Sequence, residues 1–268
     1  MNNTSNRRVL RKAAREDGPY PSSRALRGVA SVQEAPDSGA LPNWLRILNR
    51  EVIVCTRCPR LVEYREKIAR EKRRAYLEWD YWGKPVPGFG DPDARVLLLG
   101  LAPGAHGSNR TGRPFTGDSS GYFMYPVLYD TGFASQPNAT HCGDGLRLID
   151  AYITAAVRCA PPDNKPTPLE IANCSCYLDR EISGLKKLRV IVALGRIGFD
   201  SYLNYVQRQG MLKGKKAYTF AHGVHYQMPD GKILLASYHP SNQNTNTGKL
   251  TRSMFVKIFQ EARRLADR

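Results

Sequence analysis

Six cysteines occur in this chain of 268 residues, and their spacing suggests one metal centre. Cys55 and Cys58 form a C-x2-C pair, a spacing typical of metal-binding thiolates. Cys159 supplies a third thiol, and Cys174 a fourth, with Cys176 as a rival to Cys174. Four thiolates suit either structural zinc or an iron–sulfur cluster, and spacing alone does not separate the two. The remaining cysteines are interpreted as ordinary small residues.

A long polar loop follows the apolar run at residues 96–99 and is a second candidate for chemistry. Residues 95–121 read RVLLLGLAPGAHGSNRTGRPFTGDSSG. The apolar run predicts a buried strand. The loop is too rich in glycine and polar residues for a core, and too long for a simple connection, so a binding role is favoured. Its glycines match neither G-x-G-x-x-G nor G-x-x-x-x-G-K-[ST], which argues against those two phosphate sites.

The elements that must position these residues alternate between strands and helices, which predicts an α/β fold with a central four-stranded parallel sheet covered by helices on both faces. The four apolar runs that predict buried strands are Val96–Leu99, Tyr152–Val157, Val190–Leu194 and Ile233–Ser237. Helical patterns occupy about 119–131, 168–185, 196–208 and 250–266, and two more, 41–55 and 59–79, flank the C-x2-C pair. Ligands bind beyond the carboxyl ends of such strands, so we expect the loops 100–118, 158–168 and 238–250 to converge.

The charge balance points to a polyanionic partner. The chain has 40 Lys and Arg against 24 Asp and Glu, a formal net charge of +16. Such a surface attracts nucleic acid, although a basic surface without a particular partner is the alternative. Residues 1–42 predict a basic, disordered arm, because they offer little apolar surface to offset ordering, and residues 43–268 predict a single domain. No apolar run of about 20 residues or secretory signal is found, so we expect a soluble, cytoplasmic protein with no membrane partner and no obligate protein partner.

Several long motifs, taken in order, make the chain resemble the family 5 uracil-DNA glycosylases, the iron–sulfur type of bacteria and archaea. The resemblance covers about residues 50–265 and implies the α/β/α sandwich of that superfamily. The motifs are CTRCPRLVEYRE, PVPGFGDPDARVLLLGLAPGAHGSNRTGRPFTGD, YITAAVRCAPPDNKPTP, VALGRIGF and ASYHPSNQNTNTGKLT. The resemblance further implies a monofunctional enzyme of base excision repair that excises uracil from DNA by hydrolysing the N-glycosidic bond. Hypoxanthine is a second candidate base.

The same resemblance implies a cofactor. The family's four ligands to a 4Fe-4S cluster match Cys55, Cys58, Cys159 and Cys174. This match favours Cys174 over Cys176, and the family's cluster is thought to be structural.

A glycosylase must flip the nucleotide out of the duplex, so the base needs a surface to stack on and donors for its oxygens. Phe115 matches the family's base-stacking phenylalanine, and its alternative role is to anchor the loop. His239 is the candidate donor to the carbonyl oxygen of the leaving base; alternatively it caps a helix or satisfies a backbone carbonyl. Further backbone donors are expected from Leu101, Ala102, Gly104 and Ala105, because glycine permits close approach.

Cleavage of an N-glycosidic bond builds positive charge on the sugar, so a carboxylate and a positioned water are needed. Ala102 stands where other uracil glycosylases carry a polar residue. By resemblance Asp118 becomes the candidate that stabilises the charge or orients the water, with Asn164 and Asn244 in support. The alternative for Asp118 is a helix N-cap, and both roles can hold together.

The segment NTGKLT and the residue after it are the expected DNA contacts. Lys249 and Arg252 suit phosphates, and Leu250 is expected to fill the gap left by the flipped base; the alternative is an ordinary helix start with a solvated basic face. Two competing functions remain at this stage. One is a non-catalytic DNA-binding module with an iron–sulfur or zinc site, and the other is a zinc-stabilised hydrolase acting on another base or nucleotide. For a repair enzyme we expect association with the nucleoid.

Overall fold

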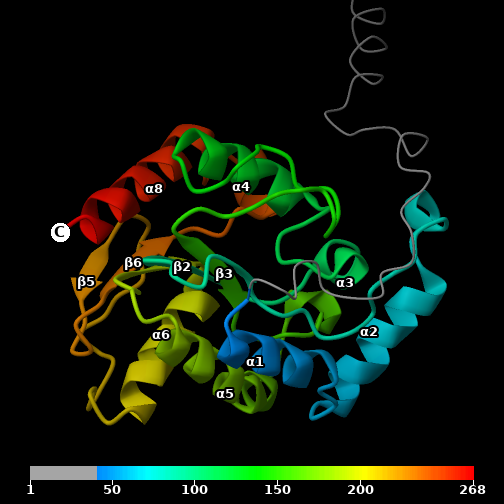
Figure 1. Cartoon of the computed structure of the whole chain (residues 1–268), viewed down its shortest axis with the longest axis horizontal. Coiled ribbons are helices and arrows are strands. Elements are labelled where there is room, and N and C mark those ends of the chain that lie inside the picture. Colours follow the sequence, from blue (N-terminus) through cyan, green and yellow to red (C-terminus); the bar gives the residue numbers. More distant parts are fainter. Residues whose placement is uncertain (1–40) are drawn as a thin grey trace, which may run out of the picture.

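The computed structural model describes residues 41–268, and the predicted arm at 1–42 therefore lies almost wholly outside the described residues. Within them a six-stranded sheet has the order β1-β3-β2-β4-β6-β5 (Figure 1). The four predicted strands are its parallel centre: β2 (Val96–Gly100), β3 (Ala151–Ala155), β4 (Val190–Leu194) and β6 (Ile233–Ser237). The α/β class is confirmed, but the count of four strands was too low. The additions are short antiparallel edges, β1 (Phe89–Gly90) and β5 (His225–Gln227).

Helices cover both faces of the sheet, as predicted (Figure 1). One face carries α4 (Ser119–Asp130) and α8 (Arg252–Ala266). The other carries α1 (Asn43–Ile53), α5 (Pro168–Gly184) and α6 (Arg196–Arg208). The remaining short helices are α3 (Ser108–Thr111), α7 (Asn242–Asn246), η3 (Arg74–Tyr76) and η4 (Pro162–Asn164). None of the helices in the described part is long and apolar enough to cross a membrane.

The helix predicted over 59–79 is shorter than expected. It is α2 (Pro59–Glu71), and it ends where Lys72 takes a φ of 55°. A lysine in this left-handed region cannot continue a right-handed helix. The chain then passes through η3 and brings the aromatic residues of 76–82 against the loop that follows β2.

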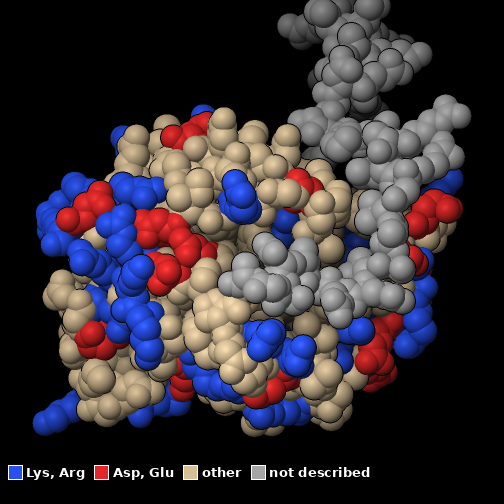
Figure 2. All heavy atoms as spheres, viewed as in Figure 1, with Lys and Arg blue, Asp and Glu red and all other residues tan. Residues whose placement is uncertain are grey.

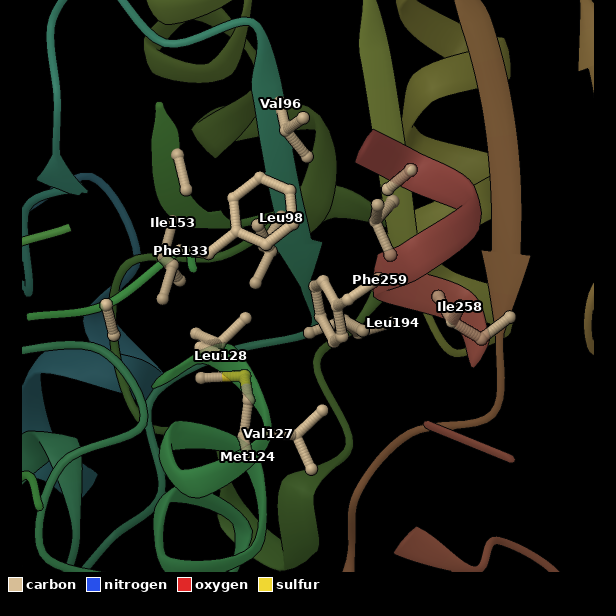
Figure 3. Close-up of a cluster of buried hydrophobic side chains, with 14 of the residues drawn as sticks. Val96, Leu98, Met124, Val127, Leu128, Phe133, Ile153, Leu194, Ile258 and Phe259 are labelled. Atoms are coloured by element: carbon tan, nitrogen blue, oxygen red, sulfur yellow. The ribbon is translucent and has the colours of Figure 1, made fainter. Parts of the chain in front are cut away.

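The alternation of side chains along β2 explains the two halves of the core. Val96 and Leu98 pack with α4 and α8 on one face, as Figure 3 shows, while Leu97 and Leu99 pack on the opposite face. All four are fully buried. Successive residues of a strand point to opposite faces, so a strand covered on both sides reads as a continuous apolar run.

Strand order reverses between β2 and β4. From β2 the chain moves to β3 on one side, then crosses back to β4 and β6 on the other. The first residues of the four strands lie in one row, with Val96 opposite both Ala151 and Val190, and Val190 opposite Ile233. Their carboxyl ends therefore form one edge, and a point of strand reversal at that edge is where ligands bind in open α/β sheets.

The amino ends of the strands carry a separate network of charges. Arg95 pairs with Asp150 at 2.6 Å and with Asp267 at 2.8 Å, and Arg263 reaches the same Asp150 at 3.1 Å. Figure 2 shows Lys and Arg gathered over β5 and the end of α8, with acidic side chains among them. Part of the basic charge, at Arg95 and Arg263, therefore stabilises the position of the last helix at the edge opposite the predicted site.

Candidate active site

Phe115 and His239 meet at the carboxyl edge of the sheet, although 124 positions separate them in the sequence (239 − 115). Their ring centroids are 5.7 Å apart and the rings are tilted by 32°. The ring of Phe115 lies over Gly100 at the end of β2, where an added Cβ would come within 3.0 Å of it. His239 lies over Gly195, which follows β4. The loops after β2, β4 and β6 therefore converge at the point of strand reversal.

The backbone at Phe115 is held in an unfavourable conformation. Its φ is 51°, in the left-handed region that side chains other than glycine seldom adopt. Gly121 makes this possible, because a Cβ there would lie 1.8 Å from the carbonyl oxygen of Phe115. The loop thus places one aromatic ring face at the site at the expense of local strain.

Asp118 caps α4 and also faces the glycine-rich part of the loop. Its Oδ1 accepts a hydrogen bond from the backbone N–H of Gly121 at 3.0 Å, so the N-cap alternative is confirmed. Its Oδ2 lies where side chains at Gly104 or Gly107 would be, 2.9 and 2.1 Å from their ideal Cβ positions. Burial raises the pKa of Asp118, while the cap and the positive charge of Arg110 oppose that change.

His239 is uncharged at neutral pH. Burial lowers its pKa to about 4, so the imidazole keeps one N–H and one free nitrogen. Asn244 holds the turn beneath it by donating from Nδ2 to the carbonyl oxygen of His239 at 2.8 Å. Asn244 therefore contributes to the position of His239 through the backbone.

Asn164 is not brought to this group by any contact in the described part of the chain. It is exposed in η4, with a φ of 55°. The backbone of Leu101 extends the β2–β3 ladder by accepting from Val157 at 3.0 Å. Ala102 packs against the buried group that contains Cys58, Cys159 and Cys174, so the predicted base loop rests on the cysteine-bearing segment.

The three predicted DNA contacts differ in their surroundings. Lys249 is exposed, with Nζ 4.9 Å from the ring centroid of Tyr238. Arg252 is exposed and forms an ion pair with Asp130 of α4. Leu250 has no exposed surface and belongs to the core between α4 and α8. This burial argues against the predicted wedge role, because a core side chain does not reach the base stack.

Replacing Leu250 with alanine is expected to act on stability. A buried leucine cut to alanine costs about 2–5 kcal/mol, through lost burial and the cavity left behind. We expect a lower unfolding midpoint and equal relative losses of activity on single-stranded and paired DNA. Comparison with Lys257→Ala, at an exposed position of α8, provides the control. A loss confined to paired DNA would instead restore the wedge role.

The four predicted cysteine ligands line one cavity. Cys55 and Cys58 come from the turn between α1 and α2, Cys159 from the loop after β3, and Cys174 from α5. Cys176 does not line the cavity; its thiol accepts a hydrogen bond from Arg57 at 2.9 Å.

Polar groups already point at the sulfur atoms of this cavity. Arg65 donates from Nη1 to Cys159 Sγ at 3.1 Å, and Asn173 donates to Cys58 Sγ at 3.5 Å. Burial raises the pKa of the Cys159 thiol to about 11 and that of Cys174 to about 12. Among residues 41–268 no three His, Cys, Asp or Glu side chains are placed to hold a metal ion at one point.

Sequence reasoning missed the aromatic residues that enclose the loop after β2. Arg110 lies between Tyr76 and Trp79, and the Tyr81 hydroxyl is 3.1 Å from His106 Nδ1. The density of aromatic residues in RAYLEWDYW was the available signal, but the helical interpretation of that segment obscured it.

Comparison with known proteins adds an independent finding. The sequence model described as "Uracil DNA glycosylase superfamily" matches residues 87–263. A type-5 uracil-DNA glycosylase of Thermus thermophilus is 54% identical over 224 residues, which cover 82% of this chain and 99% of the relative. Type-5 enzymes of Mycobacterium bovis and Pyrobaculum aerophilum are 47% and 40% identical, over 82% of this chain and 81% and 92% of their own lengths.

Proposed function

This chain belongs to the uracil-DNA glycosylase superfamily, and from that membership we propose which of its residues carry the reaction. The enzyme is a type-5 uracil-DNA glycosylase, a hydrolase that excises uracil from DNA for repair. The reaction breaks the bond between C1′ of deoxyribose and N1 of uracil, adds the hydroxyl of water to C1′ and returns its proton to the base. The observation that carries our assignment is the contact of the Phe115 and His239 rings at the strand reversal, with the second oxygen of Asp118 facing Gly104 and Gly107 of the same loop.

In the proposed mechanism Phe115 stacks on the flipped uracil, because its ring is fixed at the strand reversal by the loop backbone. His239 donates its N–H to a carbonyl oxygen of uracil as negative charge develops on the base. A neutral imidazole suits this role, because at neutral pH it has one N–H to donate and carries no second proton on its other nitrogen. Backbone N–H groups of the loop at Leu101, Ala102, Gly104 and Ala105 are the further candidate donors.

Asp118 acts on the sugar side in this proposal. Its carboxylate stabilises the positive charge that builds at C1′ and orients the attacking water. The N-cap bond uses one oxygen, and the other faces the glycine-rich loop. Asn244 supports His239 through its backbone oxygen, while Asn164 remains a candidate on sequence grounds alone.

Lys249 is the proposed phosphate contact, because its exposed ammonium follows α7 and lies over the ring of Tyr238, the residue before His239. Arg252 joins it when its ion pair with Asp130 opens. We propose double- and single-stranded DNA with uracil as substrates, hypoxanthine as a second base, and a nucleoid location.

The cysteine cavity suits an iron–sulfur cluster. The thiolates of four residues would hold a 4Fe-4S cluster there: Cys55, Cys58, Cys159 and Cys174. The N–H groups of Arg65 and Asn173 suit thiolate or sulfide acceptors. When bound, the cluster supplies a structural link between α2, the loop after β3 and α5.

Metal analysis of the purified protein is expected to find iron and acid-labile sulfide in equal amounts. Cys174→Ser should lower both, because a buried ligand is lost, whereas Cys176→Ser should leave both unchanged as the matched control. Stoichiometric zinc without sulfide would contradict the assignment, and so would equal losses in the two variants.

The assay for the proposed function uses labelled duplex DNA with one uracil opposite guanine, followed by alkali to cut abasic sites. We expect a break at the uracil and none in a matched duplex with thymine. Failure to cut by protein with its full iron content would favour the non-catalytic DNA-binding module.

A further inference from the structure

Arg110 packs against two aromatic rings that stand nearly perpendicular to one another, with an angle of 83° between their planes. Its Cζ lies 3.9 Å from the ring centroid of Tyr76 and 4.1 Å from a ring centroid of Trp79, and only 3% of the residue is exposed. Its Nε donates to the carbonyl oxygen of His106 at 2.8 Å, and its Nη2 to that of Gly117 at 2.7 Å. The guanidinium is therefore fixed by two rings and two backbone oxygens.

One nitrogen of this guanidinium is left over. Nη1 is buried and finds no hydrogen-bond partner in the range 41–268. The carbonyl that Nη2 holds belongs to Gly117, the residue directly before Asp118. Arg110 and Asp118 form no direct ion pair within the described chain, but the positive charge is near enough to oppose protonation of the carboxyl.

We propose that Arg110 is a positioning residue for Asp118, which it holds in place through Gly117 and keeps charged through space. The inference rests on the proposed role of Asp118. A carboxylate that acts on the sugar needs its negative charge, yet the low polarity around it favours the protonated form. Because Arg110 bonds to backbone oxygens, it supplies positive charge without covering the carboxylate that must face the water or sugar.

The rings of Tyr76 and Trp79 form an aromatic clamp, which explains how a buried guanidinium is tolerated here. The faces of Tyr76 and Trp79 replace part of the lost hydration, since aromatic faces attract cations. Both rings come from the segment that leaves α2 after Lys72. That segment thereby contributes to the active site from outside the motif that contains Asp118.

The other titratable groups around this pair do not supply a competing cation. Tyr125 of α4 faces Asp118 and donates its hydroxyl to Pro114, and its pKa is raised by burial to about 12. Tyr76, Tyr81 and Tyr122 surround Arg110. The pKa of His106 is lowered by burial and then by Arg73 and Arg110. Among the described residues, the positive charge that acts on Asp118 is that of Arg110.

The test is the pH dependence of single-turnover uracil excision by Arg110→Met, Arg110→Lys and Asp118→Asn. Arg110→Met should move the acid limb of the profile to higher pH, with the largest loss of rate at low pH and recovery at high pH. Arg110→Lys should move the acid limb much of the way back to its wild-type position, because lysine also carries a positive charge. Trp79→Leu removes one of the two rings of the clamp, at a partly exposed position, and should shift the acid limb by a smaller amount in the same direction. This variant tests the inference if Arg110→Met does not fold.

The matched control is Arg113→Met. Arg113 is equally buried in the same loop but pairs with Asp144 at 2.7 Å, so its removal should lower stability without moving the acid limb. Equal loss of rate at every pH in Arg110→Met, or an equal shift in Arg113→Met, would overturn the inference. A limb that Asp118→Asn abolishes and Arg110→Met leaves in place overturns this inference alone. A limb unchanged in Asp118→Asn refutes the role of Asp118 itself; the lowered pKa of His239 then explains the limb.

Discussion

Replacing Asp118 with asparagine is expected to slow single-turnover excision of uracil by about two to four orders of magnitude. The carboxylate charge that stabilises the sugar cation and orients water is lost. The helix cap survives, because asparagine is as good an N-cap as aspartate and can accept the same bond from Gly121. We therefore expect α4, the unfolding midpoint and DNA affinity to be nearly unchanged.

Two measurements separate this effect from a structural one. Excision is followed by alkaline cleavage with enzyme in excess, and affinity is measured by fluorescence anisotropy on DNA with a non-cleavable uracil nucleotide. Asp93→Asn is the control, since Asp93 is exposed at the opposite edge and, among the described residues, its ion pair is with Lys187 at 3.3 Å. Cleavage at the wild-type rate in Asp118→Asn would remove Asp118 from the mechanism.

Replacing Glu181 with leucine is expected to lower the free energy of unfolding by about 3–5 kcal/mol. Glu181 has no exposed surface and pairs with Arg158, which is 2% exposed. Its carboxylate also accepts from Thr154 at 2.7 Å and from Tyr152 at 3.3 Å. The variant leaves the Arg158 charge buried without a partner, directly beside Cys159, and such a loss is a large part of a typical stability of about 5–15 kcal/mol.

The second change Arg158→Met in the same molecule should recover much of the loss, because it removes the unpaired charge. Urea midpoints are compared between samples of equal iron content. The exposed pair of Arg196 and Asp200 gives the control, where Asp200→Ala should cost about 0.5 kcal/mol or less. If the double variant were as unstable as the sum of both single variants, the buried pair would not be the cause.

The central fold could be predicted because each parallel strand is an uninterrupted apolar run. Val190–Leu194 and Ile233–Ser237 agree with the structure to the residue. The edge strand at His225–Gln227 could not be found in this way, because it is three residues long and two of them are exposed, so it contains no apolar run. Likewise a φ of 55° at Lys72 has no signature in a run of charged residues that otherwise favours a helix.

The site was predicted in part, for a related reason. Phe115, Asp118 and His239 each follow a strand, so the carboxyl-edge rule places them together. Leu250 reads as a residue at a helix start, and only the packing of α4 against α8 shows that it is core. Arg110 reads as one more basic residue, because its burial depends on aromatic rings more than 30 positions earlier in the chain.

The wide separation of the two cysteine pairs in the sequence determines when the cysteine cavity can form during synthesis of the chain. Helix α1 packs on α5, with Trp44 against Gly184, and the cavity needs Cys55 and Cys58 as well as Cys174. At a synthesis rate of about 5–20 residues per second, the first two helices wait roughly 6–25 s on the ribosome for the partners that bury them. A chain released before residue 174 lacks the fourth cysteine and cannot complete the cavity, and one released before residue 184 also lacks the contact with Trp44. We therefore expect chains truncated before residue 174 to be degraded without acquiring metal, so that the proposed cluster assembles only after all four cysteines have been made.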